Sequence, residues 1–164
     1  MTYLDLINNV LRRLREDTVT TANATDYSSL IGDLVNDAKR VVEDAFDWTA
    51  LRESITVNTV SGTDTYSLTG SGDLAVIKDV MNTTSQRFMH LRSKEYFNNV
   101  TYNTTPQSGE PDYFTFVGTD SNRDLEVQVY PKPDAVYALR FDVVKPQSDL
   151  SSDSDSLSVP TNVK

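Results

Sequence analysis

The chain has 164 residues, of which 38% are hydrophobic and 24% charged, and its 24 acidic and 15 basic residues give a formal net charge of −9. This length allows one compact domain or two small ones with a buried core. The acidic balance argues against broad binding of nucleic-acid phosphates. The absence of Cys and the presence of a single His argue against thiol and zinc chemistry. No apolar run approaches the ~20 residues that span a bilayer, and the first ten residues lack the basic region of a signal peptide.

The first predicted element is a helix near the N-terminus. Thr2 is a suitable N-cap, and Asp5 three residues later comes close to completing a capping box. Apolar residues then recur at helical spacing, at Leu4, Ile7, Val10, Leu11 and Leu14. The helix should end in the basic group Arg12, Arg13 and Arg15, and the polar residues 16–24 predict a loop.

A second, longer helix should start at Thr25 or Asp26. Its apolar positions step by three and four over about five turns, at Leu30, Ile31, Leu34, Val35, Ala38, Val41, Val42, Ala45 and Phe46. The opposite face is charged, with Asp33, Asp37, Lys39, Arg40, Glu43, Asp44 and Asp47. Because a hairpin buries one side of each helix, we expect the sheet or another copy to cover the remaining apolar surface.

From Ser54 onward, apolar and polar residues alternate, which indicates strands. The predicted strands are 54–59, 65–68, 74–81, 87–91, 113–117, 125–130 and 137–144, with Gly- and Pro-containing turns between them. A short helix capped by Ser93 should interrupt them and reach Asn98.

These elements together predict an α+β protein. We expect a helical hairpin or bundle segment in residues 1–50 and an antiparallel β-sandwich or barrel in residues 51–146. Residues 147–164 should form an extended tail or linker, because their Ser- and Asp-rich composition can bury little. The seam between helix and sheet falls at Phe46, Trp48 and Leu51, where we expect Trp48 to pack as a hinge.

Few residues suggest catalytic or metal chemistry. His90 lies between apolar neighbours, so we expect a structural strand position, since a general base needs an oriented partner. Residues 120–124 begin like a calcium loop, but Leu125 and Pro131 stand where that loop needs Gly and Glu, so a hairpin turn is expected. The sequence therefore predicts no catalytic, cofactor or metal residue and no enzyme. A small acid-dependent hydrolase stays open only because 24 acids always offer some carboxylate pair.

Several stretches together resemble a known family. They are LDLINNVLRRLRED, YSSLIGDLVNDAKRVVEDAFDWTALRESITV, SGEPDYFTFVG, DLEVQVYPKPD and YALRFDVVKPQSDLSSDSD, followed by LSVP. In this order they resemble the head-to-tail adaptor (connector) proteins of tailed bacteriophages, in particular podophage adaptors of the tail tubular protein A or gatekeeper type. The resemblance covers nearly the whole chain, and the junction of helix, Trp48 and strand is its most specific part.

The resemblance implies a structural virion protein without catalytic activity. Such adaptors form a ring of typically about twelve copies in the virion neck, between the portal and the tail tube or nozzle, after assembly in the host cytoplasm. The ring would continue the DNA channel without sequence-specific binding and without a membrane. Family members usually continue past the Val-Pro segment into further bundle helices, so residues 147–164 are interpreted as leading toward such helices.

The resemblance also suggests where contacts lie. An acidic channel wall repels DNA phosphates, so we hypothesise that Asp33, Asp37, Glu43, Asp44 and Asp47 face the channel, the alternative being an ordinary solvated face. Contact with the portal or a neighbouring copy is expected first from the tail, since an unpacked segment orders on a partner. The candidates there are Pro146, Gln147, Asp149, Leu150, Leu157, Val159 and Pro160. The cluster Arg12, Arg13 and Arg15 is second, with helix C-terminal capping as its alternative.

A different class of function competes with the adaptor. A β-sandwich on a helical stalk could bind glycans or a host surface as part of a phage tail, and exposed aromatic residues would serve that role. The candidates are Tyr96, Phe97, Tyr102, Tyr113 and Tyr137, although strand alternation places most of them in the core.

Overall fold

In the computed structural model, which describes residues 1–160, the first helix begins at its predicted cap. Helix α1 (Tyr3–Leu14) starts after Thr2, whose hydroxyl accepts a hydrogen bond from the Asp5 amide at 3.2 Å. The Asp5 carboxylate accepts one from the Thr2 amide at 3.0 Å, which completes a capping box. The helix ends at Arg15, whose left-handed backbone (φ 63°) lets its amide donate to the carbonyls of the last turn.

Helix α2 (Asp26–Asp44) is capped by Thr25, which exchanges hydrogen bonds with Ser28. Its buried face differs from the predicted apolar stripe. Of the nine apolar positions, Ile31 is buried and Val35 half-buried, whereas Leu30, Leu34 and Val41 are exposed. The face turned inward is made of Ser28, Ile31, Gly32, Asn36, Lys39 and Glu43. It is largely polar because a polar segment packs on it, as described below.

The two helices pack around one small apolar core, formed by Tyr3, Ile7, Leu11, Ala22, Ile31 and Leu150. Gly32 lets α1 approach α2 closely. A Cβ at this position would overlap the Tyr3 hydroxyl and lie 3.1 Å from Tyr3 Cζ and 3.5 Å from Ile7 Cδ1. The helical hairpin is therefore built on a glycine contact.

Residues 146–160 are not an unpacked tail, which corrects that prediction. Leu150 and Val159 are buried, and Leu150 belongs to the core of the helices. The chain thus divides into a helical unit, formed by residues 1–51 together with the chain from Pro146, and a β-unit, formed by residues 52–145. None of the helices in residues 1–160 has the length and apolar character that a membrane span requires.

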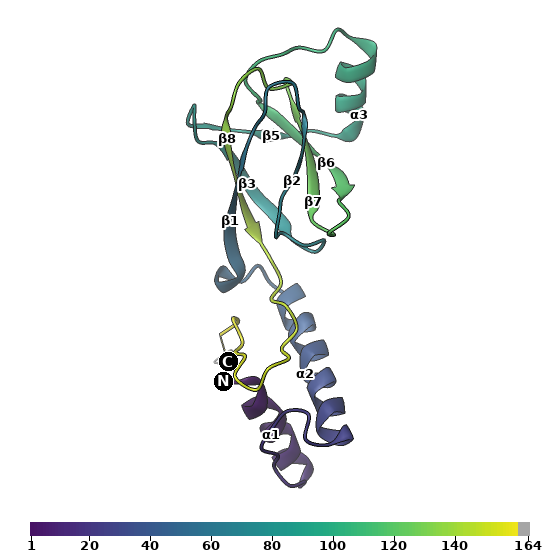
Figure 1. Cartoon of the computed structure of the whole chain (residues 1–164), viewed down its shortest axis with the longest axis vertical. Coiled ribbons are helices and arrows are strands. Elements are labelled where there is room, and N and C mark those ends of the chain that lie inside the picture. The colour runs from purple at the N-terminus through teal and green to yellow at the C-terminus, as the bar shows by residue number, and fades with distance from the viewer. Residues whose placement is uncertain (161–164) are drawn as a thin grey trace. The chain divides into compact units, whose positions relative to one another are not determined.

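The β-unit is a sandwich of two four-stranded sheets (Figure 1). The first has the order β1 (Arg52–Asn58), β8 (Ala138–Val144), β3 (Val76–Asn82) and β4 (Arg87–Phe88). The second has the order β2 (Thr65–Ser67), β7 (Leu125–Tyr130), β6 (Tyr113–Thr119) and β5 (His90–Leu91). Inward side chains of both sheets, including Leu68, Val80, Val127, Leu139 and Phe141, form its core. The predicted α+β class, with antiparallel-rich sheets after N-terminal helices, is confirmed.

The predicted strand 87–91 is in fact two short strands in different sheets. The break falls at the buried Met89, with β4 pairing β3 in one sheet and β5 pairing β6 in the other. The β5–β6 pair is parallel, although an antiparallel domain was predicted. A parallel pair needs a crossover connection between its strands. Here the connection contains helix α3 (Lys94–Asn98), which is capped by Ser93 as predicted, and a π-helical turn at Asn99–Asn103.

Replacing Gly32 by Ala tests the helix contact. Alanine favours a helix by up to ~1 kcal/mol over glycine, but overpacking costs about 1–3 kcal/mol. We therefore expect Gly32→Ala to lower the free energy of unfolding of the helical unit. Unfolding is measured by the fluorescence of Trp48, the single Trp of the chain. Gly109→Ala is the matched control, since no atom lies within 4 Å of a Cβ there. Equal stability of the two variants would contradict the close approach.

Candidate interaction surfaces

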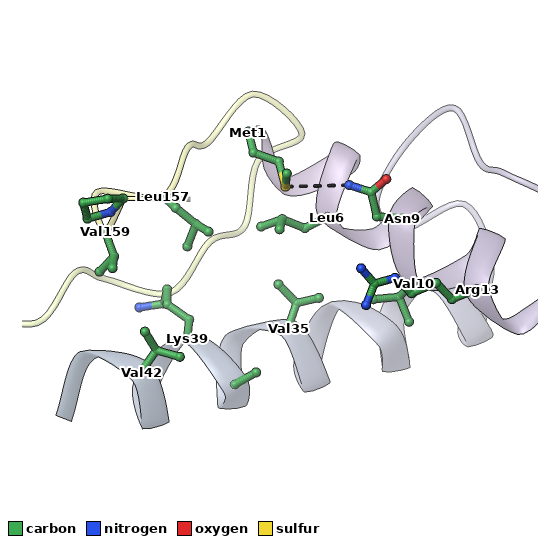
Figure 2. A pocket seen from close by; sticks show the side chains of 12 residues that line it. Met1, Leu6, Asn9, Val10, Arg13, Val35, Lys39, Val42, Leu157 and Val159 are labelled. Atoms are coloured by element: carbon green, nitrogen blue, oxygen red, sulfur yellow. Dashed lines mark hydrogen bonds between the residues drawn. The ribbon is translucent and has the colours of Figure 1, made fainter. Parts of the chain in front are cut away.

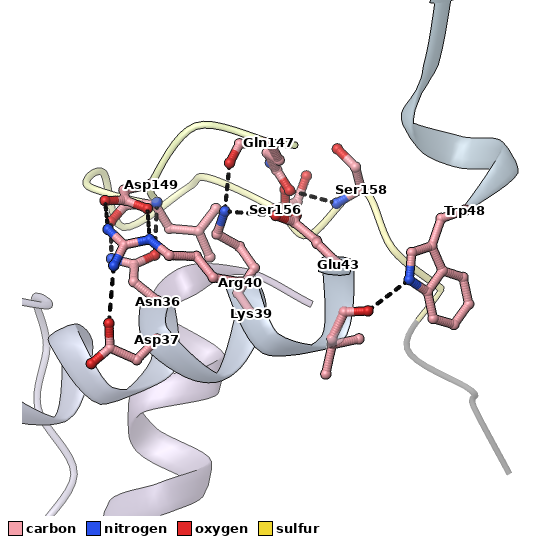
Figure 3. A network of polar contacts seen from close by, with 12 residues as sticks. Asn36, Asp37, Lys39, Arg40, Glu43, Trp48, Gln147, Asp149, Ser156 and Ser158 are labelled. Carbon is pink, nitrogen blue, oxygen red and sulfur yellow. Dashed lines mark hydrogen bonds and ion pairs between the residues drawn. The ribbon is translucent and has the colours of Figure 1, made fainter. Parts of the chain in front are cut away.

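The side chain of Asn36 binds the C-terminal segment (residues 146–160) to α2 (Figure 3). Asn36 Nδ2 donates to the Leu150 carbonyl at 3.0 Å, and Asn36 Oδ1 accepts from the Leu150 amide at 2.9 Å. Both residues are buried. Asn36 thus satisfies a buried peptide group in the way a paired strand would.

A buried ion pair lies one turn further along α2. Lys39 Nζ donates to the Gln147 carbonyl at 2.5 Å and to Glu43 Oε2 at 3.3 Å. The side chains of Lys39 and Glu43 are only 2% and 1% exposed. Within the described part of the chain, Glu43 Oε1 has no hydrogen-bond partner. A buried side chain cannot line a channel, so Glu43 does not belong with the predicted channel-facing acids.

The C-terminal segment also covers the start of α1. The amides of Tyr3 and Leu4, which have no partner inside the helix, donate to the carbonyls of Asp155 and Asp153 at 2.7 and 3.3 Å. The Ala22 amide donates to the Asp153 carboxylate at 2.7 Å. The segment therefore bonds to both helices and to the loop between them.

Two carboxylates of the segment, Asp149 and Asp155, make polar contacts at the surface. Arg40 bridges Asp37 and Asp149, and its hydrogen bond with Asp149 raises the pKa of the guanidinium. Asp155 Oδ2 accepts from the amides of Ser151 and Ser152, each at 2.8 Å, and these bonds lower the pKa of Asp155.

The remaining predicted channel acids lie on the surface. Asp33, Asp37, Asp44 and Asp47 are exposed, and the first three follow helical spacing along α2. Their direction relative to a channel is an assembly property and stays a prediction.

The arginine cluster has mixed roles. Arg12 donates to the Asn8 carbonyl and to Asn9 Oδ1, and Arg15 forms the C-cap, so both make contacts within their own helix end. All three arginines are exposed, and Arg13 lines a cavity between the helices.

The predicted seam residues lie at the end of α2. The Trp48 indole donates to the Val42 carbonyl at 2.8 Å, and its ring meets the exposed Phe46 edge to face at 5.3 Å. Leu51 is buried at the end of a 3₁₀ turn, Thr49–Leu51. Trp48 thus caps a carbonyl of the last helical turn.

Three carboxylates that could suit catalysis, Glu43, Asp120 and Asp124, are engaged in structural contacts. Glu43 is paired with Lys39, and the buried Asp124 accepts from the Gly72 amide at 2.9 Å. Asp120 holds the turn between β6 and β7 by accepting from the amides of Asn122 and Asp124, which confirms the predicted hairpin turn. His90 is an exposed strand residue in β5. In residues 1–160, no group of three or more His, Cys, Asp and Glu side chains is placed to hold a metal ion.

The polar contact face on α2 was missed by the sequence analysis. Ser28, Gly32, Asn36, Lys39 and Glu43 follow steps of four, four, three and four residues. This is a helical period of small and polar residues, and it could have indicated a polar partner for α2. The apolar positions of α2 form a longer regular pattern, and that pattern alone predicts the apolar side as the buried one.

The described geometry is a helical unit completed by the C-terminal segment (residues 146–160), with exposed apolar and charged surfaces. The chain belongs to the SU10 adaptor protein family, whose model matches residues 1–163. It is therefore a phage adaptor protein, as the resemblance suggested, and membership implies a structural role in the virion neck. The narrower podophage tail tubular protein A assignment stays a prediction. No curated protein matches the chain in a sequence search.

Asn36→Ala should loosen the C-terminal segment. The Leu150 amide and carbonyl would both lose their partner, at about 1–3 kcal/mol for each unsatisfied group. We expect faster amide exchange at Leu150 and earlier proteolysis of the segment. Arg40→Ala, which removes only exposed ion pairs, is the control and should change little. Unaltered exchange at Leu150 in Asn36→Ala would refute this role of the amide.

Acid should release the turn around Asp155. Its pKa is lowered in the folded protein, so its contribution to stability is complete above the ordinary Asp pKa of about 3.9 and disappears as the pH falls through the lower folded pKa. Amide exchange at Ser151 and Ser152 should therefore accelerate at acid pH. Asp155→Asn keeps an acceptor oxygen but cannot titrate, so it should lack this pH dependence. The same acid profile in both proteins would assign the effect to another group.

Proposed function

We propose that the chain is a head-to-tail adaptor that forms a ring, typically of about twelve copies, between the portal and the tail and continues the DNA channel. Family membership supports this. The observation that carries it is the row of apolar residues left exposed on α2, including Leu30, Leu34 and Val41. A contiguous exposed apolar row is unusual on a protein that works alone and is expected where copies or partners pack.

The acids beside this row are candidates for the channel wall. Asp33, Asp37 and Asp44 lie next to the apolar row on α2, on the side away from the core. If the row packs against a neighbouring copy, these acids border the interface. A wall of this charge repels DNA phosphates and lets DNA pass without sequence-specific binding.

Portal contact is proposed to involve the folded surface of the helical unit and not a free tail. Leu150 and Val159 are buried, and Gln147 is bonded to Ser156 and Ser158. These residues would have to unfold from the helices to reach a partner. Arg13, which is exposed, is the stronger candidate for pairing with acids of the portal or of a neighbouring copy.

One observation favours a glycan-binding role as second candidate. Around α3, an open hollow of about 750 Å³ is lined by the aromatic rings of Tyr96 and Tyr102 and by Asn98, Asn99 and Asn103. Tyr102 is 81% exposed. Among the other aromatic candidates Phe97 is buried, and Tyr113 and Tyr137 are half-buried. Ring faces and amides are suited to sugars, but the same residues also suit a protein interface.

Cryo-electron microscopy of the virion neck tests the proposal. We expect a ring of this chain between portal and tail, with Asp33 and Asp44 directed toward the axis. Copies on the outer tail surface would favour the glycan-binding role. A neck ring with Asp33 and Asp44 directed outward would keep the adaptor but overturn the channel assignment.

A further inference from the structure

Helix α2 carries a continuous apolar row that its own unit leaves uncovered. This α2 stripe consists of Tyr27, Leu30, Leu34 and Val41, which are 44%, 53%, 54% and 70% exposed. Steps of three, four and seven residues place the four side chains along one line of the helix. The exposed Ala45 falls on the same line, and so does the exposed Ala38, which also lines the neighbouring cavity between the helices.

A second apolar feature lies between the two helices. Figure 2 shows this α1–α2 groove, a cavity of about 490 Å³ to which α1, α2 and the C-terminal segment all contribute. Its apolar lining is Leu6 and Val10 from α1, Val35 and Val42 from α2, and Leu157 and Val159 from the C-terminal segment.

Two of the polar side chains that line the groove, Lys39 and Asn9, are already engaged. Lys39 is bonded to Glu43 and Gln147, and Asn9 is bonded to Met1 and Arg12. A pocket for a small molecule usually offers a few free polar groups that orient the ligand. This groove offers mainly aliphatic surface, which fits a row of apolar side chains better than a polar ligand.

Charge complementarity favours the α2 stripe of another copy as the row of apolar side chains that packs into the groove. A chain with a net charge of −9 repels its own copies unless acidic and basic patches meet. The α2 stripe is flanked by Asp33 and Asp44, and by Asp37, which Arg40 already pairs, whereas the exposed Arg13 lies at the groove. Packing the stripe into the groove brings acids toward this arginine, which favours that pairing over stripe against stripe.

We infer that the α2 stripe of one copy packs into the α1–α2 groove of the next copy. This inference rests on the proposed ring, for which it names the interface. The two surfaces are different parts of the same chain, so the contact is heterologous and each copy leaves one stripe and one groove open. Such contacts propagate from copy to copy and close into a ring when the rotation allows.

Cysteine cross-linking tests the contact, because the chain has no Cys of its own. Leu34→Cys marks the stripe and Val10→Cys the groove. The two single variants are mixed in virion necks or at protein concentrations where the wild-type chain associates, then oxidised and analysed on non-reducing gels. We expect a disulfide-linked dimer from the mixture, while each variant alone stays monomeric. Thr18→Cys, in the exposed loop, replaces Val10→Cys in the matched control and should give no dimer with Leu34→Cys.

The outcomes separate the inference from the proposed function. A mixture that stays monomeric in necks that contain the ring overturns the stripe-in-groove contact and leaves the adaptor intact, with the groove open to a portal segment or an apolar ligand. Dimers from Leu34→Cys alone would show stripe against stripe and also overturn it. Necks without a ring of this chain would refute the proposed function itself. Circular dichroism of each variant confirms that it folds. If Val10→Cys fails to fold, Leu157→Cys marks the groove from the C-terminal segment.

Discussion

The helical unit depends on one constraint: two helices cannot enclose a core alone, so a segment from the other end of the chain completes it. Asn36 is central, because its amide satisfies both peptide groups of Leu150 and so allows the Leu150 side chain to enter the core. Without such a partner, a segment rich in Ser and Asp could not be buried, because its peptide groups would lose their hydrogen bonds to water. The Lys39–Glu43 pair extends the same arrangement along α2.

This closure makes the β-unit an insertion within the helical unit. The chain leaves the helices at Leu51 and returns at Pro146. Within the sandwich, Arg52 pairs with Val144 in the β1–β8 ladder, so the two connections start side by side.

Helix α2 has three sides that differ in their chemistry. One side faces the core and the C-terminal segment, one carries exposed acids, and one carries the α2 stripe. Helical spacing alone separates these sides, since residues three and four apart fall on the same line. An adaptor that assembles around DNA needs attraction between copies and repulsion toward phosphate. In the proposed ring, α2 would provide both from adjacent faces.

The sequence by itself determined most elements: the near-complete capping box at Thr2, the helix start at Thr25 or Asp26, most strand positions, the α3 cap at Ser93 and the turn at Asp120 are local features that depend on neighbouring residues. It also indicated the adaptor family. Only the tertiary structure decided which side of α2 is buried, that Glu43 is inside, that residues 146–160 are packed, and that the strand 87–91 divides between two sheets. Those outcomes rest on contacts between residues more than a hundred positions apart, or on which sheet offers a free edge, and periodicity does not identify the distant partner segment or the sheet.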